Sequence, residues 1–216
     1  KAMKIGAFDY LTKGDGDEKL PLVVNKAVEK ARLNHQVQDM EHRLEARTSF
    51  SKIIGNSPAV YKVIELAKKV AITETTVLIL GETGTGKELL AEAIHHASRR
   101  RKGPFVPINC AAIPKDLQES ELFGHKKGAF TGASFDKKGY FETAGNGTIF
   151  LDELGEMSQD LQAKLLRALE NKTINRVGDP NPIPIDVRIV AATNKKLLPK
   201  DNEGEDGFRK DLYYRL

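Results

Sequence analysis

A glycine-rich run in the first half of the chain carries residue types that bind phosphate. The run comprises Gly81, Glu82, Thr83, Gly84, Thr85, Gly86, Lys87 and Glu88, and it matches the phosphate-binding loop pattern up to its lysine. The glycines let successive backbone N–H groups face the phosphates of a nucleotide, and Lys87 supplies a charge for the outer phosphates. Glu88 departs from the general pattern, which has a Ser or Thr there to contact magnesium. The alternative, a flexible glycine-rich turn, is disfavoured by the apolar run before the loop and the helical pattern after it.

A pair of adjacent carboxylates follows another apolar run. Residues 148–151 are Thr-Ile-Phe-Leu, and Asp152 and Glu153 come directly after them. Ligands of open α/β sheets bind at the carboxyl ends of the strands, so this pair can share a site with the glycine-rich loop. Asp152 would hold Mg²⁺, usually through water, and Glu153 would orient or deprotonate the attacking water. The alternative is a solvated acidic pair at a helix start, and it would be preferred if the glycine-rich loop were absent.

The elements that must position these groups alternate in type along the chain. Short apolar runs predict strands at 77–80, 105–108, 148–151 and 187–192. Residue patterns of helical type occupy 87–98, 161–169 and 207–216. This alternation predicts an α/β fold, in which a parallel sheet is covered by helices on both faces.

The first fifty residues follow a different pattern. Residues 7–12 predict a strand and residues 20–31 a helix. The helix is expected to continue through Leu33, Val37, Met40 and Leu44, whose successive spacings of four, three and four residues are those of a coiled-coil seam. An amphipathic linker that packs on its own domain is an equally good interpretation, because two heptads are a weak signal.

Composition excludes several classes of protein. The 216 residues include 34 Lys and Arg against 30 Asp and Glu, and a net charge of +4 is too balanced to argue for nucleic-acid contact by itself. No run approaches the roughly 18 apolar residues that span a bilayer, so we expect no membrane partner. The single cysteine, Cys110, is expected to be a small core residue, and it suits a reducing compartment, which predicts a cytoplasmic protein.

Four motifs, in this order, resemble the central AAA+ domain of sigma-54-dependent transcription activators, also called bacterial enhancer-binding proteins. They are the glycine-rich loop, Glu-Ser-Glu-Leu-Phe-Gly-His at 119–125, Gly-Ala-Phe-Thr-Gly-Ala at 128–133 and Phe-Arg-Lys-Asp-Leu-Tyr-Tyr-Arg-Leu at 208–216. The string at 128–133 is the most specific of the four. The resemblance implies an AAA+ P-loop ATPase that uses ATP and Mg²⁺. A glutamate commonly follows the loop lysine in this family, so Glu88 fits the family pattern.

The resemblance assigns roles to four further polar residues. Asn109 corresponds to an asparagine that interacts with Glu153. In the family, that asparagine links the nucleotide state to the loop that remodels sigma-54, which corresponds to residues 128–133 here. Asn194 is similar to the sensor that reads the γ-phosphate. Arg209 and Arg215 match a pair of arginine fingers that reach the ATP of a neighbouring subunit, so the resemblance implies a homo-oligomeric ring of six or seven subunits. A guanidinium supplied in this way can stabilise charge on the transferring phosphoryl group.

The resemblance also makes one short loop the contact with sigma-54. The loop comprises Gly128, Ala129, Phe130, Thr131, Gly132 and Ala133. Small neighbours cannot easily bury Phe130, so the string suits an exposed tip. A turn that is tucked against the core through Phe130 is the alternative interpretation.

The N-terminal segment resembles part of a second family. Residues 6–13 are similar to the last strand of a response-regulator receiver domain, with Lys13 as the lysine that contacts the phosphoryl group. Together the two resemblances imply three parts: 1–31 is the C-terminal end of an incomplete receiver, 32–50 is a helical linker, and 51–216 is the α/β subdomain of an AAA+ domain without its helical lid. We expect a fragment of an NtrC-type two-component response regulator. Its histidine kinase and its enhancer DNA would act through other parts of the parent protein.

The function that the resemblance implies is ATP-dependent remodelling of closed complexes of the sigma-54 RNA polymerase holoenzyme into open complexes. Without a lid, the fragment alone is expected to be a weak ATPase. Two alternatives stay open at the level of sequence. One is a different AAA+ remodelling ATPase, and the other is a nucleotide-gated assembly module in which binding without turnover is the switch.

Overall fold

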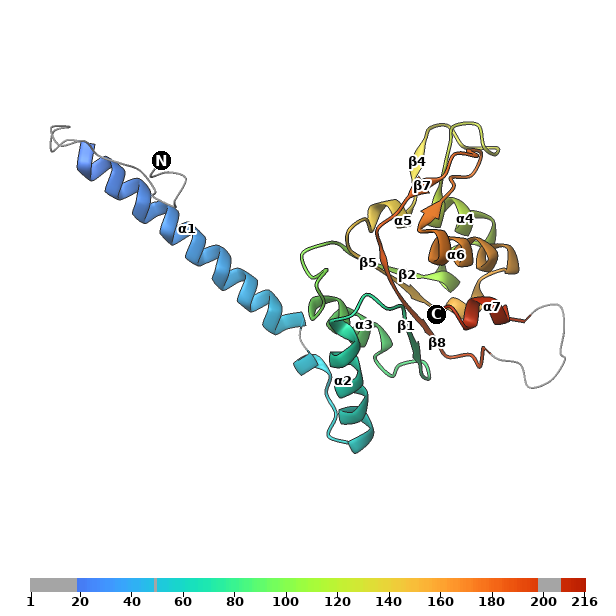
Figure 1. The fold of residues 1–216 in the computed structure, drawn as a ribbon, viewed down its shortest axis with the longest axis horizontal. Coiled ribbons are helices and arrows are strands. Elements are labelled where there is room, and N and C mark those ends of the chain that lie inside the picture. The colour runs from blue at the N-terminus through green and yellow to red at the C-terminus, as the bar shows by residue number, and fades with distance from the viewer. Residues whose placement is uncertain (1–18, 49, 198–206) are drawn as a thin grey trace. The chain divides into compact units, whose positions relative to one another are not determined.

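The computed structural model describes residues 19–48, 50–197 and 207–216, and it separates the chain into two units, Lys1–Arg47 and Thr48–Leu216. Helix α1 (Lys19–Thr48) runs for 30 residues and makes up the described part of the first unit (Figure 1). This confirms the predicted helix and its continuation. Within the described ranges, no helix combines the length and the apolar character that crossing a bilayer requires.

Two predictions for the N-terminal part stay untested. The predicted strand at 7–12 and Lys13 lie outside the described residues. Leu33 is exposed on α1. The side chains of Val37, Met40 and Leu44 lie outside the described part, so the coiled-coil seam stays a prediction.

The second unit is built around a four-stranded sheet. Its strands are β1 (Val77–Leu80), β2 (Phe105–Asn109), β5 (Thr148–Asp152) and β8 (Arg188–Thr193). They lie in the order β1-β8-β5-β2, and every neighbouring pair is parallel. Each of the four predicted strands is confirmed to within one residue at either end. Parallel neighbours place all four carboxyl ends at one edge of the sheet.

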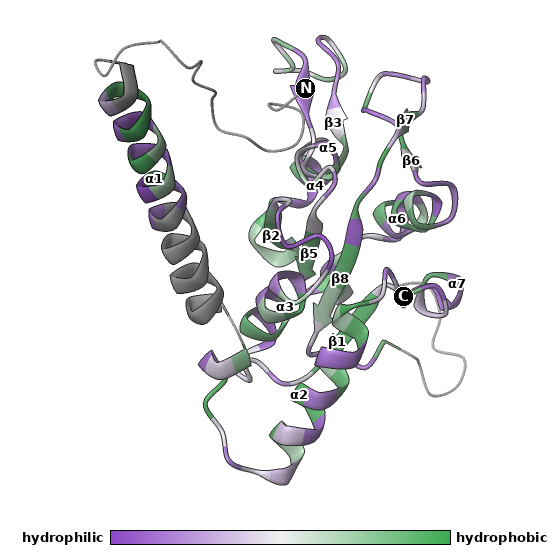
Figure 2. Cartoon of the chain, turned by 60° about the vertical axis from the view of Figure 1, so that its left-hand side comes forward, coloured by the Kyte–Doolittle hydropathy of each residue, from purple (hydrophilic) through white to green (hydrophobic). Residues whose placement is uncertain are grey.

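Helices cover both faces of this sheet, as predicted. Strand residues alternate between two apolar cores: Ile149 and Leu151 face one core, and Phe150 between them faces the other. Helices α2 (Pro58–Ala71) and α3 (Lys87–His96) supply the Phe150 side, whereas α4 (Lys115–Phe123) and α6 (Gln159–Asn171) supply the other. Figure 2 shows the strands β1, β5 and β8 largely in the hydrophobic colour and the covering helices with mixed faces.

Shorter elements surround the sheet. They are the 3₁₀ turns η2 (Phe50–Lys52), η3 (Cys110–Ala112) and η4 (Leu154–Glu156), the short helices α5 (Tyr140–Thr143) and α7 (Lys210–Tyr213), and the antiparallel pairs β3 (Gly124–His125) with β4 (Lys137–Lys138) and β6 (Thr173–Ile174) with β7 (Ile183–Pro184).

Two predicted helices are longer than the observed ones, for identifiable reasons. The helix predicted at 87–98 ends at His96, because the Ser98 hydroxyl donates to the carbonyl of His95 and competes with the helical backbone. The helix predicted at 207–216 is limited to α7. Its first part is extended at Arg209, whose backbone N–H donates to Gln162 on α6 instead.

A buried arginine joins the sheet to α2. The Arg188 guanidinium donates to the carbonyl oxygens of Val70 and Ala71 at 2.7 and 2.8 Å. These carbonyls lie at the C-terminal end of α2, which carries a partial negative charge. Burial lowers the pKa of Arg188 from its usual value. The contact fixes α2 beside the start of β8.

Candidate functional site

The carboxyl edge of the sheet brings the predicted nucleotide residues together. Asp152 ends β5, and the register pairs it with Asn109 at the end of β2. The glycine-rich loop follows β1, whose last residue pairs with Thr193 of β8, and Asn194 comes next. The four strand ends therefore gather groups from four separate stretches of the sequence.

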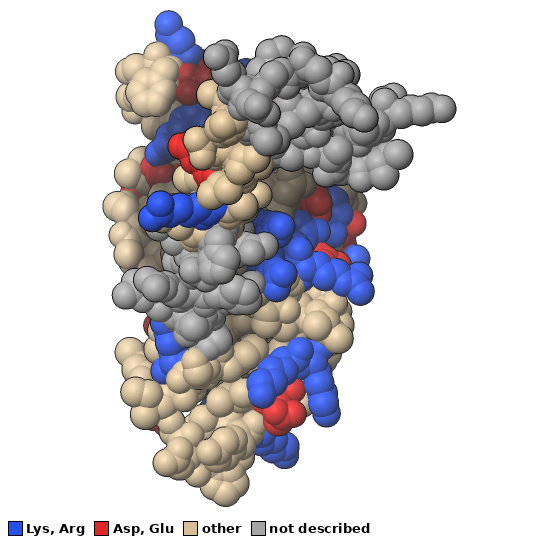
Figure 3. All heavy atoms as spheres, turned by 90° about the vertical axis from the view of Figure 1, so that its left-hand side faces the viewer, with Lys and Arg blue, Asp and Glu red and all other residues tan. Residues whose placement is uncertain are grey.

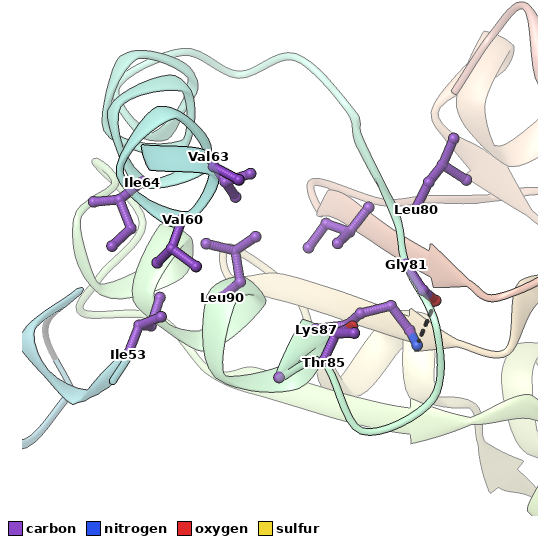
Figure 4. A pocket seen from close by; sticks show the side chains of 12 residues that line it. Ile53, Val60, Val63, Ile64, Leu80, Gly81, Thr85, Lys87 and Leu90 are labelled. Carbon is purple, nitrogen blue, oxygen red and sulfur yellow. Dashed lines mark hydrogen bonds between the residues drawn. The ribbon is translucent and has the colours of Figure 1, made fainter. Parts of the chain in front are cut away.

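The glycine-rich loop turns directly into α3. Gly84 and Gly86 have φ values of 82° and 81°, which are in the left-handed region that favours glycine. Gly86 caps α3 without a side-chain hydrogen bond, so the first N–H groups of the helix face the loop. Lys87 is 8% exposed, and its Nζ donates to the carbonyls of Gly81 and Glu82 at 3.0 Å each, as Figure 4 shows for Gly81. The loop thus offers backbone donors and one buried cation to a phosphate chain.

An apolar cavity of about 270 Å³ adjoins the loop. Ile53, Val60, Val63 and Ile64 line it from the α2 side and Leu90 lines it from α3 (Figure 4). A cavity with these walls can take a flat apolar group beside the phosphate donors. These residues were not predicted to belong to the site, because apolar positions at helical spacing predict a core face equally well. The available signal was their position just before the strand that leads into the loop.

The acidic pair sits on an unusual backbone. Glu153 has φ 52° and ψ 42°, a left-handed conformation that costs a residue with a side chain on the order of 1 kcal/mol. Its N–H donates to Asp152 Oδ1 at 2.9 Å, and both side chains are half-buried. Strain of this kind persists where the surroundings fix the backbone, and it is common at functional sites.

The buried cysteine beside the acidic pair is not a nucleophile. Burial, and then the charges of Asp152 and Glu153, raise the pKa of Cys110 to about 12. The thiol is therefore protonated at neutral pH, and Cys110 packs in the sheet core. This confirms its prediction as a core residue.

The donor set suits magnesium only in company with a nucleotide. No cluster of three or more His, Cys, Asp or Glu side chains able to hold a metal occurs among the described residues. Mg²⁺ in nucleotide sites is typically held by one or two carboxylates together with phosphate oxygens and water. Asp152, which accepts from the Glu153 N–H with one of its two carboxylate oxygens, fits that role, and Glu88 is exposed on α3.

The two predicted asparagines have defined partners. Asn194 Nδ2 donates to Thr83 Oγ1 at 3.1 Å, so the predicted sensor touches the glycine-rich loop. The Asn109 carboxamide oxygen accepts from the N–H groups of Ala111 and Ala112 at 2.9 and 3.2 Å. Asn109 therefore caps the turn η3 here, and its predicted interaction with Glu153 stays a prediction.

The two predicted arginine fingers make no hydrogen bond to the glycine-rich loop among the described residues. Arg209 forms a two-pronged pair with Asp211, with distances of 3.0 and 2.7 Å. Arg215 is exposed beyond α7. In the part of the chain that the structure describes, neither guanidinium bonds to the loop or to the acidic pair.

The loop Gly128–Ala133 is a closed turn in the hairpin between β3 and β4. The Gly128 N–H donates to the Ala133 carbonyl at 2.8 Å, and Gly128 and Gly132 have φ values of 83° and 105°. Thr131 is exposed. Phe130 is 37% exposed, and its ring meets the ring of buried His125 edge-on at 5.0 Å. Phe130 thus lies between the two predicted alternatives, because the tip is exposed but this ring is partly tucked inward.

Charge on the surface is mixed. Figure 3 shows Lys and Arg interspersed with Asp and Glu over the face that it displays, which agrees with the small net charge. Some charged side chains of the second unit are paired and partly buried, for example Arg176 with Glu142 at 2.6 Å. The Arg176 guanidinium lowers the pKa of Glu142 from its usual value.

Comparison with known proteins identifies the chain's relatives. A family model described as the sigma-54 interaction domain matches residues 53–216. Regulatory protein AtoC of Escherichia coli (strain K12) is 47% identical over 216 residues, which cover 100% of this chain and 46% of AtoC. The DNA-binding transcriptional regulator NtrC of Proteus hauseri is 49% identical over 216 residues, which cover 100% of this chain and 44% of that protein. The chain thus spans about half the length of these curated relatives.

A solved structure agrees with the same assignment. NtrX from Brucella abortus, crystallised in complex with ATP, is 34% identical, has a TM-score of 0.68, and matches 99% of this chain and 44% of its own. The chain therefore belongs to the sigma-54 interaction domain family, and its α/β core is the AAA+ P-loop NTPase fold of the NtrC-type sigma-54-dependent regulators.

Proposed function

We propose that this chain is the ATP-hydrolysing motor of a transcription activator that remodels the closed complex of the sigma-54 RNA polymerase holoenzyme into an open complex. The observation that carries the proposal is the gathering of Lys87, Asp152, Glu153 and Asn194 at one sheet edge, in a unit that also bears the loop Gly128–Ala133. The four polar residues suit nucleotide chemistry. The loop Gly128–Ala133 is short, exposed and outside the sheet.

ATP would bind with its base in the apolar cavity and its phosphates over the glycine-rich loop. The cavity lies beside Gly81, Thr85 and Lys87, so both parts of the nucleotide have adjacent partners. Lys87 would exchange its two carbonyl partners for phosphate oxygens, which carry full charge and form stronger hydrogen bonds. The related NtrX was crystallised with ATP, which supports this ligand.

Hydrolysis would use the acidic pair. Glu153 would orient or deprotonate the attacking water, and Asp152 would hold magnesium through water. Bound magnesium supplies charge stabilisation for the phosphates. Asn194, which donates to the Thr83 hydroxyl at the rim of the loop, would exchange that hydroxyl for the terminal phosphate. Asn109, at the neighbouring strand end, would relay the nucleotide state.

Arg209 and Arg215 would complete the site of a neighbouring subunit in a ring. Arg215 is exposed, and Arg209 has only an exposed carboxylate, Asp211, as its side-chain partner in the described part. Exposed ion pairs contribute little, so a neighbour's phosphate can compete for Arg209. Assembly would then control turnover, because an arginine supplied in trans stabilises transition-state charge. A receiver and an enhancer-DNA reader in the longer protein, with a cognate histidine kinase, would control assembly in the cytoplasm.

The experiment that tests the proposal separates hydrolysis from remodelling. Thr131→Ala in the full-length protein should leave the rate of ATP hydrolysis unchanged and abolish open-complex formation on a sigma-54 promoter, because Thr131 lies in the exposed turn and, among the described residues, bears no hydrogen bond to the nucleotide edge. ATPase rates and permanganate footprints of the promoter are the two measurements.

The matched control is Ser134→Ala, which removes an exposed hydroxyl directly after the loop. This variant should keep both activities. Equal loss of hydrolysis and open-complex formation in Thr131→Ala would contradict the role assigned to the loop.

A further inference from the structure

A second phenylalanine, Phe135, lies just beyond the loop Gly128–Ala133 and is the more exposed of the two. Phe135 is 65% exposed, whereas Phe130 is 37% exposed. Single apolar residues on a surface are ordinary, so exposure alone assigns nothing to Phe135. Its surroundings connect it to the loop.

Both phenylalanine rings contact the same histidine. The ring centroid of His125 lies 5.0 Å from that of Phe130 and 6.2 Å from that of Phe135. His125 is 6% exposed, and its Nδ1 lies 2.6 Å from the Ser120 hydroxyl on α4. This hydrogen bond fixes the orientation of the imidazole. The two phenylalanines therefore share one ordered aromatic support, although they are five positions apart in the sequence.

Asp136, the residue after Phe135, is hydrogen-bonded to residues on the other side of the loop. The Asp136 carboxylate accepts hydrogen bonds from Lys126 Nζ and from the Lys127 N–H, both at 2.8 Å. The bond from Lys126 holds the pKa of Asp136 below its usual value, so this acceptor is ionised at neutral pH. Phe135 is thus placed before a partner arrives, which reduces the entropy cost of binding.

Charge around the pair indicates the chemistry of the partner. Lys127 is exposed and forms no ion pair within the described residues. Lys126, by contrast, is neutralised by Asp136. Through its backbone N–H, Lys127 bonds to Asp136, the residue after Phe135. An unpaired ammonium in the same hairpin as two aromatic rings complements an apolar segment that carries acidic side chains. Figure 1 shows the connection between β3 and β4 projecting from the end of its unit, where such a segment has access.

We propose that Phe135 is a second contact residue for sigma-54. Phe130 and Phe135, supported by the His125 ring, bind as a pair to an apolar segment of sigma-54 that carries acidic side chains. This inference rests on the proposed function and extends its contact surface beyond the loop Gly128–Ala133. A neighbouring subunit of the ring is the other occupant that this surface could take, and the test separates the two.

The test is titration of sigma-54 onto the full-length protein assembled with ADP and aluminium fluoride, an analogue of the hydrolytic transition state. Phe135→Ala should weaken the affinity for sigma-54 about tenfold, since exposed aromatic anchors are frequent hot spots. Phe135→Leu should retain most of the affinity, because it keeps an apolar side chain. Ile72→Ala is the matched control: Ile72 is 63% exposed at the end of α2, and its loss should change nothing.

The outcomes of this titration distinguish sigma-54 from a neighbouring subunit as the partner of Phe135. Unchanged affinity for Phe135→Ala, with clear binding by the parent protein, would overturn this inference and leave the proposed function intact. Loss of ring assembly or of ATP hydrolysis in Phe135→Ala would also overturn it, because a neighbouring subunit would then be the occupant. No binding of sigma-54 by the parent protein would contradict the proposed function, and this inference with it.

Discussion

The nucleotide edge and the hairpin loop are built in opposite ways. At the edge, four parallel strands set the positions of the functional groups, and Lys87 is almost completely buried. The loop Gly128–Ala133 lies outside that sheet, in a hairpin whose two strands are each two residues long. Its order depends on a few hydrogen bonds and on the ring of His125.

This difference matches two different tasks. Catalysis requires groups held to within a fraction of an ångström, which a sheet core supplies. A part that acts on a partner must move at low cost, which requires few buried contacts. The two regions therefore should respond differently to substitution, and the following predictions test that expectation in order of decreasing effect.

The largest effect is expected at the acidic pair. Glu153→Gln should lower the rate of ATP hydrolysis by about 10²–10⁴-fold, because the amide cannot accept the proton of the attacking water. Nucleotide affinity should be retained, since the glycine-rich loop and the cavity are unchanged. A coupled ATPase assay and a fluorescent-nucleotide titration measure the two quantities.

The control for that variant is Glu170→Gln, at an exposed position of α6. This substitution also removes one negative charge, but at a position outside the site. The variant should hydrolyse ATP at the parent rate. If Glu153→Gln also matched the parent, nucleotide binding without turnover would be the switch.

A matched pair of glycines compares the two regions directly. Gly84 and Gly128 have φ values of 82° and 83°, and an added Cβ would meet no atom within 4 Å at either position. Alanine should therefore cost each region a similar free energy, on the order of 1 kcal/mol. Gly84→Ala should weaken nucleotide affinity about tenfold. The glycine-rich loop would shift to relieve the strain at position 84, and its N–H groups would then point less well at the phosphates.

Gly128→Ala should leave nucleotide affinity at the parent value and weaken only sigma-54 binding. Nucleotide titration and urea unfolding of both variants give the comparison. Equal loss of nucleotide affinity in the two variants would show that the loop and the edge are one structural unit, against the contrast drawn above.

The smallest effect on the two functional regions is expected from His95, the buried histidine of α3, because its titration by acid acts on the stability of the fold. Burial, and then the charge of His96, lower the pKa of His95 to about 4. The unfolded chain takes up this proton near pH 6.5, so the stability contributed by neutral His95 is present above about pH 6.5 and is lost as the pH falls toward 4. The free energy of unfolding should fall by up to about 1.4 kcal/mol per pH unit in that window.

Urea unfolding at about pH 7.5 and about pH 5.5 measures this slope. His95→Gln should be less stable at the higher pH, since the side chain bonds to Thr148 at 2.8 Å, and it should show a shallower slope. Some slope should remain, because the pKa of His96 is lowered as well, chiefly by burial. An unchanged slope in His95→Gln would assign the acid sensitivity to other groups.

Much of the sheet and the phosphate loop could be predicted from local residue patterns. Strands buried on both faces appear as continuous apolar runs, which made Val77–Leu80 and Thr148–Asp152 recognisable. Gly84 and Gly86 were recognisable because only glycine adopts their backbone readily. The wall of the nucleotide cavity was missed, because Val60 and Val63 have the same apolar pattern whether they face a core or a ligand.

The sequence by itself determined the strands, the phosphate loop and the family, because these depend on residue types at short spacing. Only the tertiary structure decided which distant groups meet. Asn194 reaches Thr83, 111 residues away, because the sheet order places β8 beside β1. The single His125 ring beneath both Phe130 and Phe135 likewise depends on the hairpin geometry. Such contacts follow from packing of the whole chain, which no local pattern encodes.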